Sequence, residues 1–237
     1  MTATETAFDE ALGRYGVTRL AHFTPSLNLR HIIEDGRITS SRDLAENAPE
    51  YFSPTDRERF DGHPDKICCT FQYPNAYYLD QARRRPEYTN YPDWVCVLLS
   101  PVLVARPGAL FSPRNAAAGR GSHLRAGLEG LESCFAERVG GYTRKHRHLA
   151  GAATDLQAEV LVPGPIDTSF ITAVVVSGVE QAAQEFSRLR MFGLRPERFV
   201  WAVSPELFDK NELRRRIHEG VPIVPAPWTP AHDREGA

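Results

Sequence analysis

The chain has 237 residues, of which 42% are hydrophobic and 24% are charged, and its formal net charge is −2. This balance is typical of a globular chain that buries a sizeable core, and the near-zero net charge excludes a strongly basic nucleic-acid-binding protein. No apolar run approaches the ~20 residues that cross a bilayer and the polar N-terminal segment is not a secretory signal, so we expect a cytoplasmic protein with no membrane partner.

The apolar pattern predicts helices and strands that alternate irregularly along the chain. In chain order we expect a helix over 1–15, a strand over 17–24, a helix over 26–36, a strand over 66–73, a helix over 75–85, a strand over 93–104, a helix near 129–138, strands over 155–164 and 170–178, and helices near 180–191 and 210–220. The polar segment 40–66 is expected to be irregular, and the Pro-rich tail 221–237 to fray. No glycine-rich nucleotide-binding motif follows a strand, so these elements favour a mixed α/β or α+β sandwich in one domain, with a core over about 17–207.

The spacing of cysteines and histidines gives no sign of a metal site. Cys68, Cys69, Cys96 and Cys134 lack the C-x-x-C spacing, and His146 and His148 have no third ligand at a useful distance along the chain. We therefore expect four reduced core thiols and no bound metal.

Charge is distributed unevenly. The window 94–128 contains four arginines and no Asp or Glu, and the window 138–154 is also free of acids and contains the run Arg-Lys-His-Arg-His at 144–148. Two locally basic windows in a near-neutral chain predict one basic face and an anionic partner. Solvated loops that lack acidic residues remain the alternative interpretation.

The segment DLQAEVLVPG (155–164) combines an apolar strand pattern with a carboxylate. Leu156 and Ala158 alternate on one face, which places Gln157 and Glu159 together on the other face. A fixed carboxylate there would stabilise the oxocarbenium-like charge that develops when an N-glycosidic bond breaks, and the neighbouring amide would orient the second reactant. An edge strand with a solvated polar face explains the same spacing, so from the residues alone both interpretations stay open.

Other polar residues have positions suited to binding a nucleotide. His22 and Thr24 occupy alternate positions at the end of a predicted strand, and Asn28 follows one helical turn later. Arg57 and Arg59 lie in the polar segment, where either guanidinium would clamp a pyrophosphate. The alternatives are a core histidine, a capping threonine and solvated loop arginines.

Two further segments combine stacking or small residues with polar ones. Tyr73 and Tyr78 precede three arginines and offer stacking surfaces for a nicotinamide or a base, although the aromatic core face of a helix also explains them. In LFSPRNAAAGRGSH (110–123) the small residues allow close approach of a ligand, and Arg114 and Asn115 are candidates to contact a base edge.

Taken together, these segments resemble the DarT-type DNA ADP-ribosyltransferases. HFTPSLNLRHIIEDG (22–36) is similar to the family's H-x-T strand end followed by N-L-x-x-I-x-x-x-G, and LQAEVLVPGPI (156–166) is similar to its Q-A-E-h-L-V strand, in which h is hydrophobic. The resemblance covers roughly 17–177. Two segments depart from the better-known members: ICCTFQYPNAYYL replaces a Y-V-P-F-Y-F-x-P-R-S-P-like stretch, and FSPRNAAAG replaces a T-D-G-H-A-like stretch. The modified base therefore does not follow from the resemblance.

The resemblance implies an α+β fold, an ADP-ribosyltransferase-like split β-sandwich with peripheral helices that binds NAD as co-substrate. It implies that Glu159 is the catalytic carboxylate and that Arg59 assists it, with Arg57 as the alternative arginine. The predicted NAD contacts are His22, Thr24, Asn28, Arg57, Tyr73 and Tyr78, and the predicted nucleic-acid contacts are Gln157, Arg114, Asn115, Arg144, Lys145 and Arg147.

The predicted function is NAD-dependent transfer of ADP-ribose to a base of single-stranded DNA. The family implies a toxin of a toxin–antitoxin or phage-defence system, with a macrodomain antitoxin as its partner. The alternatives are an ADP-ribosyltransferase that acts on RNA or protein, an RNA 2′-phosphotransferase of the same type of fold, and a non-catalytic nucleic-acid-binding module that uses the two basic windows. Dependence of the activity on Glu159 would separate an ADP-ribosyltransferase that acts on RNA or protein from an RNA 2′-phosphotransferase. NAD turnover would exclude the non-catalytic binding module.

Overall fold

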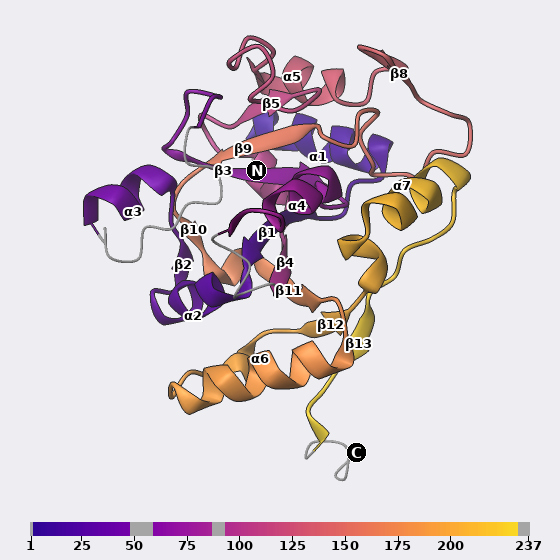
Figure 1. Cartoon of the computed structure of the whole chain (residues 1–237). Coiled ribbons are helices and arrows are strands. Elements are labelled where there is room, and N and C mark those ends of the chain that lie inside the picture. Colours follow the sequence, from indigo (N-terminus) through magenta and orange to yellow (C-terminus); the bar gives the residue numbers. More distant parts are fainter. Residues whose placement is uncertain (1, 48–58, 87–92, 232–237) are drawn as a thin grey trace.

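A nine-stranded sheet forms the centre of the computed structural model, which describes residues 2–47, 59–86 and 93–231 (Figure 1). The strands run in the order β13 (Ala226–Trp228), β12 (Trp201–Val203), β11 (Ile171–Val176), β4 (Trp94–Leu99), β1 (Leu20–Pro25), β3 (Lys66–Phe71), β9 (Glu159–Pro163), β5 (Leu110–Ser112) and β6 (Arg125–Ala126). Neighbouring strands are antiparallel except β11 and β12, which are parallel. Two short antiparallel pairs lie apart from this sheet: β2 (Arg37–Ile38) with β10 (Ile166–Asp167), and the hairpin of β7 (Arg138–Val139) and β8 (Tyr142–Thr143).

The sheet is split between β1 and β3. β1 pairs with β4 over its whole length, whereas it pairs with β3 only at Leu20 and Ala21. Beyond Ala21 the backbones of the two strands are no longer paired, and the imidazole of His22 reaches across the gap, where its Nδ1 lies 2.8 Å from the carbonyl oxygen of Cys68 on β3. The split creates an opening between two half-sheets that are each held together by regular strand pairing.

Helices cover both faces of the sheet. On one face lie α1 (Ala3–Tyr15), α2 (Ser26–Glu34), α5 (Gly127–Ser133) and α6 (Val179–Met191), and on the other lie α4 (Ala76–Ala82) and α7 (Lys210–Glu219), while α3 (Ser41–Asn47) follows β2 (Figure 1). Short 3₁₀ turns occur at Pro101–Ala105, Thr168–Phe170, Pro196–Arg198 and Pro205–Phe208. All of β4 is buried, with alternate residues in the two cores, which confirms the predicted central strand.

The connection from β1 to α2 places several polar side chains near the split. Pro25 ends the strand and occupies the N-cap position of α2, because its fixed φ suits the start of a helix and its missing N–H is not needed there. Gly36, with φ +69°, turns the chain from α2 into β2, which confirms the predicted C-terminal glycine. The short strand and the short helix thus present His22 and Asn28 to the same side of the opening.

Several boundaries differ from the sequence predictions. The strand predicted over 155–164 begins at Glu159, because the backbone N–H of Gln157 donates to Asp155 Oδ1 at 2.9 Å and closes a turn. The prediction that Gln157 and Glu159 share a strand face is therefore wrong. α3 forms inside the segment predicted to be irregular, and the tail predicted to fray contains β13, which pairs with β12. The core also extends N-terminal to the predicted limit, since α1 buries Phe8 and Leu12.

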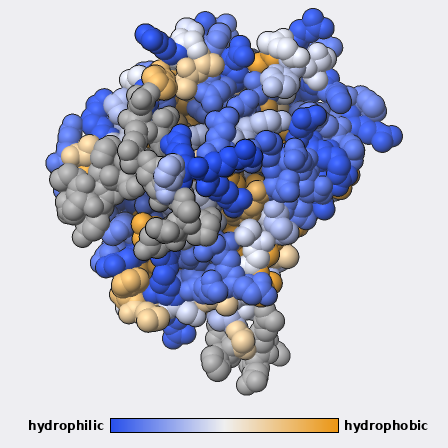
Figure 2. Space-filling view, viewed as in Figure 1, coloured by the Kyte–Doolittle hydropathy of each residue, from blue (hydrophilic) through white to orange (hydrophobic). Residues whose placement is uncertain are grey.

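An exposed apolar area stands out on the mostly hydrophilic face in Figure 2. It lies over the end of α6 and the adjoining part of α2, at the lower left of the view, where Leu27, Met191 and Phe192 are exposed. The guanidinium of Arg30 covers one side of the Phe192 ring, 3.9 Å from its centroid. In the part of the chain that the structure describes, no helix combines the length and the apolar character needed to cross a membrane.

Candidate active site

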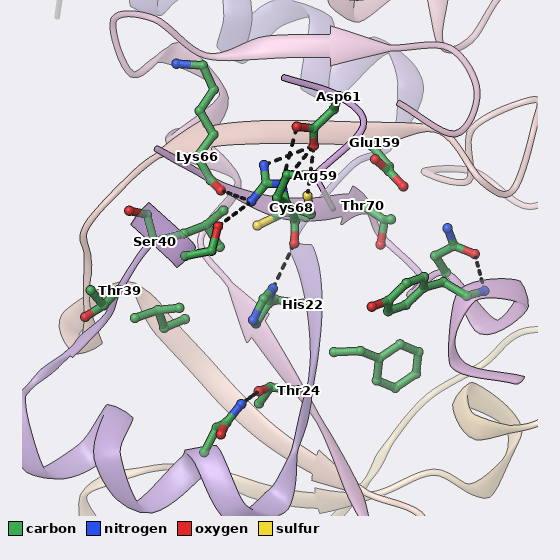
Figure 3. A pocket seen from close by; sticks show the side chains of 18 of the residues that line it. His22, Thr24, Thr39, Ser40, Arg59, Asp61, Lys66, Cys68, Thr70 and Glu159 are labelled. Atoms are coloured by element: carbon green, nitrogen blue, oxygen red, sulfur yellow. Dashed lines mark hydrogen bonds and ion pairs between the residues drawn. The ribbon is translucent and has the colours of Figure 1, made fainter. Parts of the chain in front are cut away.

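A cavity of about 400 Å³ lies at the split in the sheet. Its walls come from β1, β3, the first residue of β9, α2, the segment from β2 to α3, and α4 (Figure 3). A volume of this size is in the range of small-molecule and cofactor sites, about 300–1,000 Å³. The cavity brings together side chains from the N-terminal third of the chain and from β9, which the sequence separates widely.

His22 supplies a neutral hydrogen-bond acceptor to this cavity. Burial lowers the pKa of the imidazole below its usual value of 6.5, against the opposing effect of the hydrogen bond to Cys68. Because a carbonyl oxygen only accepts, the Nδ1 that faces Cys68 carries the proton and donates it. In the neutral ring Nε2 is then an acceptor, suited to a hydroxyl or an amide N–H of a ligand.

Thr24 and Asn28 form a second polar pair in the cavity wall. The Asn28 Nδ2 donates to the Thr24 Oγ1 at 3.0 Å, between the end of β1 and the first turn of α2 (Figure 3). Because the Thr24 hydroxyl accepts in this contact, its own hydrogen can point to a ligand, and the Asn28 carbonyl oxygen can accept. The pair therefore offers one donor and one acceptor side by side.

Arg59 is fixed in the wall by hydrogen bonds on every edge of its guanidinium. Its Nε lies 3.2 Å from Asp61 Oδ2, and its Nη2 pairs with the same carboxylate at 3.0 Å and donates to the carbonyl oxygen of His63. Its Nη1 donates to Ser41 Oγ at 3.3 Å and to the backbone oxygen of Lys66 at 2.9 Å (Figure 3). The Arg59 and Asp61 side chains are only 12% and 4% exposed, so the turn that they close is a rigid part of the site.

Glu159 lies at the first residue of β9, beside this ion pair. Its Oε2 accepts from the backbone N–H of Ala116 at 3.3 Å. Burial raises the pKa of the Cys68 thiol well above its usual value, and the charge of Glu159 raises it further while Arg59 opposes the shift. These influences place Glu159 and Arg59 around the Cys68 sulfur, whose Sγ is 3.9 Å from Asp61 Oδ2. Cys68 is therefore a protonated thiol between charged groups and is not a nucleophile.

The loop between β5 and β6 adds Asn115 and Ala117 to the cavity next to Glu159. The Asn115 Oδ1 accepts from the backbone N–H of Ala117 at 2.9 Å, and the N–H of Ala118 donates to the Asn115 carbonyl at 3.0 Å. This turn fixes the amide orientation, so that the Asn115 Nδ2 is the group with donors for a ligand. A carboxylate acceptor and an amide donor therefore lie at the same end of the cavity.

A sequence model of one protein family matches residues 21–208, and that family is described as DarT, ssDNA thymidine ADP-ribosyltransferase. The chain belongs to the DarT family. Comparison with curated proteins gave no match. The family match confirms the resemblance drawn from the H-x-T and Q-A-E segments, and it identifies the family's activity as ADP-ribosyl transfer to thymidine in single-stranded DNA.

Solved DarT structures share the fold of this chain. Thermosipho africanus DarTG in complex with ADP-ribose is 19% identical with a TM-score of 0.58, and the match covers 81% of this chain and 51% of that one, so this chain spans about half of the Thermosipho protein. Thermus sp. 2.9 DarT in complex with NAD⁺ is 16% identical, with a TM-score of 0.53 over 81% of this chain and 98% of that one. The same Thermus protein in complex with ADP-ribosylated ssDNA gives a TM-score of 0.54 at 16% identity, over 82% and 97% of the two chains. These likenesses confirm the predicted ADP-ribosyltransferase-like split β-sandwich with peripheral helices.

The DarT cavity contains only part of the residue set predicted from the sequence. The predicted residues that line it are Glu159, Arg59, His22, Thr24, Asn28, Tyr78 and Asn115. Tyr73 lies instead in the core under α4 and α7, with the Arg19 guanidinium 5.8 Å from its ring centroid. Gln157 is in the turn before β9 and is not among the lining residues, and Arg57 lies outside the residues that the structure describes.

The predicted basic contacts do not line the cavity. Arg144 folds back onto its own segment, where its Nη1 donates to the carbonyl oxygen of Ala152 at 2.7 Å. Arg114 lies near Asp155: burial raises the pKa of that carboxyl group, and the positive charge of Arg114 opposes the rise. Lys145 and Arg147 are exposed on the surface of the segment before Glu159. The basic window therefore divides into inward-facing and solvent-facing side chains.

Several residues of the DarT site were not singled out in the sequence. Asp61 follows Arg59 by two residues, and the structure pairs the two side chains in the wall. On β3, Ile67 and Cys69 belong to the core, so Cys68 and Thr70 alternate toward the other face. This alternation in KICCTF (66–71) was the sequence signal that could have predicted Cys68 and Thr70 as residues facing the cavity. Within the described ranges, no group of three or more His, Cys, Asp or Glu side chains is placed to hold a metal ion.

Proposed function

We propose that this chain transfers ADP-ribose from NAD to thymine in single-stranded DNA, with Glu159 as the catalytic carboxylate. The observation that carries this proposal is one cavity lined by His22 from β1, Arg59 from the turn before β3 and Glu159 from β9, at the split of the sheet. The description of the matching family names the same reaction and the same acceptor. NAD and carba-NAD⁺ are the ligands of the Thermus DarT structures, which supports NAD as the co-substrate here.

NAD would be held chiefly by the polar groups of β1 and α2. The neutral His22 Nε2 accepts from a ribose hydroxyl or from the nicotinamide amide, and the Thr24–Asn28 pair offers the complementary donor and acceptor. Tyr78 gives an aromatic wall, with the Arg85 guanidinium 5.9 Å from its ring centroid. Arg59 acts as a fixed cation of the wall, because its N–H groups are committed to Asp61 and to protein oxygens.

The chemical step breaks the bond between the ribose C1′ and the nicotinamide nitrogen, and the electron pair leaves with nicotinamide. Positive charge then develops on C1′ and the ring oxygen, and the Glu159 carboxylate stabilises it. In thymidine the one ring N–H is at N3, so N3 attacks C1′ and its proton passes to Glu159, a general-base role that typically contributes 10²–10⁴-fold. The Asn115 amide donates to a thymine carbonyl beside this N–H.

The proposed reaction also leads to proposals for the DNA contacts, the cellular location and the partner of the protein. We propose that the exposed Lys145 and Arg147, in the segment before Glu159, contact the phosphates of the DNA strand. Because NAD and single-stranded DNA occur inside the cell, the protein acts in the cytoplasm. The resemblance to DarT toxins suggests a toxin whose modification is removed by a macrodomain antitoxin, and a solved neighbour is a DarTG protein.

A product-mass experiment tests this function. The protein is incubated with NAD and one acceptor at a time, which is single-stranded DNA, RNA or protein. The masses of the digested products are then measured, with NAD-free reactions as controls. We expect the mass of one ADP-ribose on thymidine from the DNA reaction alone. The same mass on a ribonucleoside, on an amino acid or on another deoxynucleoside would overturn the assignment of the acceptor, and no product in any reaction would overturn the enzymatic function.

A further inference from the structure

The loop between β5 and β6, residues 113–124, contacts both sides of the proposed catalytic site. Its Ala116 N–H donates to Glu159 Oε2 at 3.3 Å, and its Gly121 N–H donates to the Ala116 carbonyl at 3.1 Å. At the same glycine the loop packs on the Arg59–Asp61 turn, since a Cβ built on Gly121 would lie 2.7 Å from the Asp61 carbonyl oxygen. Gly121 therefore connects the Arg59–Asp61 turn with Ala116, whose N–H contacts the Glu159 carboxylate.

Two independent features require glycine at this position. The φ of Gly121 is +80°, a conformation that residues with a side chain rarely adopt. The atom that a Cβ would meet belongs to the backbone of Asp61, whose carboxylate is held by Arg59 and by the His63 N–H. A side chain cannot rotate away from a backbone atom, so either the loop or the turn must move.

A second glycine in the same region offers a matched comparison. Gly127, at the start of α5, has φ +73°, and a Cβ built there meets no atom within 4 Å. Substitution by alanine imposes similar backbone strain at both positions. Only at Gly121 does it also force the loop away from Asp61.

We infer that Gly121 is a positioning residue that sets the place of the Ala116 N–H at the Glu159 carboxylate. This inference rests on the proposed function, because it requires Glu159 to be the catalytic group. Close contact at Gly121 seats the loop against the rigid Arg59–Asp61 turn, and the Gly121–Ala116 hydrogen bond transmits that position to the N–H. The N–H then orients the carboxylate and favours its ionised form.

The main test compares Gly121→Ala with Gly127→Ala in the transfer reaction. For Gly121→Ala we expect kcat to fall on the order of tenfold to a hundredfold while the KM for NAD stays within about threefold. We also expect the acidic limb of the kcat–pH profile to move to higher pH, because a carboxylate that loses an N–H donor is protonated more easily. Gly127→Ala should keep the wild-type kcat and pH profile, and thermal unfolding of both variants reports their common backbone strain.

Ala116→Pro tests the same hydrogen bond without changing the glycine. Residue 116 is the second residue of the turn closed by the Ala118 N–H and the Asn115 carbonyl, a position that favours proline. The substitution removes the N–H that Glu159 accepts, so it should move the acidic limb in the same direction as Gly121→Ala. If Gly121→Ala does not fold, this variant decides the question.

The outcomes separate the inference from the function on which it rests. Equal losses in Gly121→Ala and Gly127→Ala, or an unchanged acidic limb in both Gly121→Ala and Ala116→Pro, would overturn the positioning role while wild-type transfer upholds the proposed function. A wild-type protein that transfers nothing from NAD to single-stranded DNA would overturn both.

Discussion

The cavity wall and the basic segment 144–148 use polar side chains in opposite ways. In the wall, His22 on β1 reaches across the split to a backbone oxygen of β3, and Arg59 fixes the turn that leads into β3, so side chains that hold the wall also line the cavity. In the basic segment, Arg144 and His148 hydrogen-bond to the backbone oxygens of Ala152 and Ala153, and neither side chain lines the cavity. A cluster of basic residues in the sequence therefore does not by itself identify a binding surface, whereas polar side chains from separate elements that converge on one cavity do.

The largest difference between the two regions should appear in stability. Arg59→Ala leaves Asp61 buried without its cation, and removing one partner of a buried pair typically costs about 3–5 kcal/mol. Arg144→Ala removes hydrogen bonds of a half-buried side chain, so we expect about 1–2 kcal/mol. Urea unfolding of both variants measures these values. Equal destabilisation by the two substitutions would contradict the distinction between the wall and the segment.

The next effect concerns NAD affinity. His22→Phe removes the Nε2 acceptor from the cavity, and we expect the Kd for NAD to rise about tenfold. His148→Phe, in the basic segment, should leave it unchanged. Because the pKa of His22 lies below 6.5, the wild-type affinity should be constant above that pH and fall once the imidazole is protonated. Calorimetric titration as a function of pH checks both points, and a His148 variant that weakens binding as much as His22→Phe would refute the assignment.

A smaller effect concerns acid stability and arises in the basic segment. Burial, with a further contribution from the charge of Arg144, lowers the pKa of His148 from 6.5 to about 4. The folded state then binds this proton more weakly than the unfolded chain, so stability is complete above pH 6.5 and is lost as the pH falls toward about 4. With allowance for partial solvent screening, we expect a loss of about 1 kcal/mol. Urea unfolding at about pH 7 and about pH 4.5 should show a smaller difference for His148→Gln than for wild type.

The smallest predicted effect concerns the exposed cations of the same segment. Lys145→Ala and Arg147→Ala should each weaken single-stranded DNA binding about two- to threefold. Each should also reduce the slope of the logarithm of the binding constant against the logarithm of the salt concentration by about one, because one fewer counterion is released. Arg144→Ala should leave the salt dependence unchanged, because that guanidinium is bound to backbone oxygens. Fluorescence titrations with an oligonucleotide at several salt concentrations measure the slopes. A reduced slope for Arg144→Ala alone would place the DNA on the inward side of the segment.

The sequence predicted the parts of the site that depend on local pattern. The passage from a short strand to a short helix predicted that His22, Thr24 and Asn28 lie close together, and all three line the cavity, because alternation along the strand and the helical turn are both local properties. The resemblance of the strand predicted over 155–164 to the family's Q-A-E strand predicted that Glu159 lies beside them. The position of the split was not predictable, since it depends on β1 and β3 pairing at only two positions.

The predictions that differ from the structure depend on backbone conformations that the residue types do not reveal. Gln72 has φ +57°, unusual for a residue with a side chain, and it turns the chain so that Tyr73 enters the core while Tyr78 faces the cavity. Arg59 likewise has φ +38° in the turn that directs it onto Asp61. For Gln157 the deciding interaction is the turn closed by Asp155, which competes with extension of the strand.

The central claim is that Glu159, at the split of the sheet, is the catalytic carboxylate, and one substitution tests it most directly. Glu159→Gln keeps the size of the side chain and removes its negative charge. We predict that single-turnover transfer of ADP-ribose to thymidine in single-stranded DNA falls on the order of 10³-fold, while the Kd for NAD and the thermal unfolding temperature stay close to wild type. Transfer within about tenfold of wild type by a folded, NAD-binding Glu159→Gln protein would contradict the account.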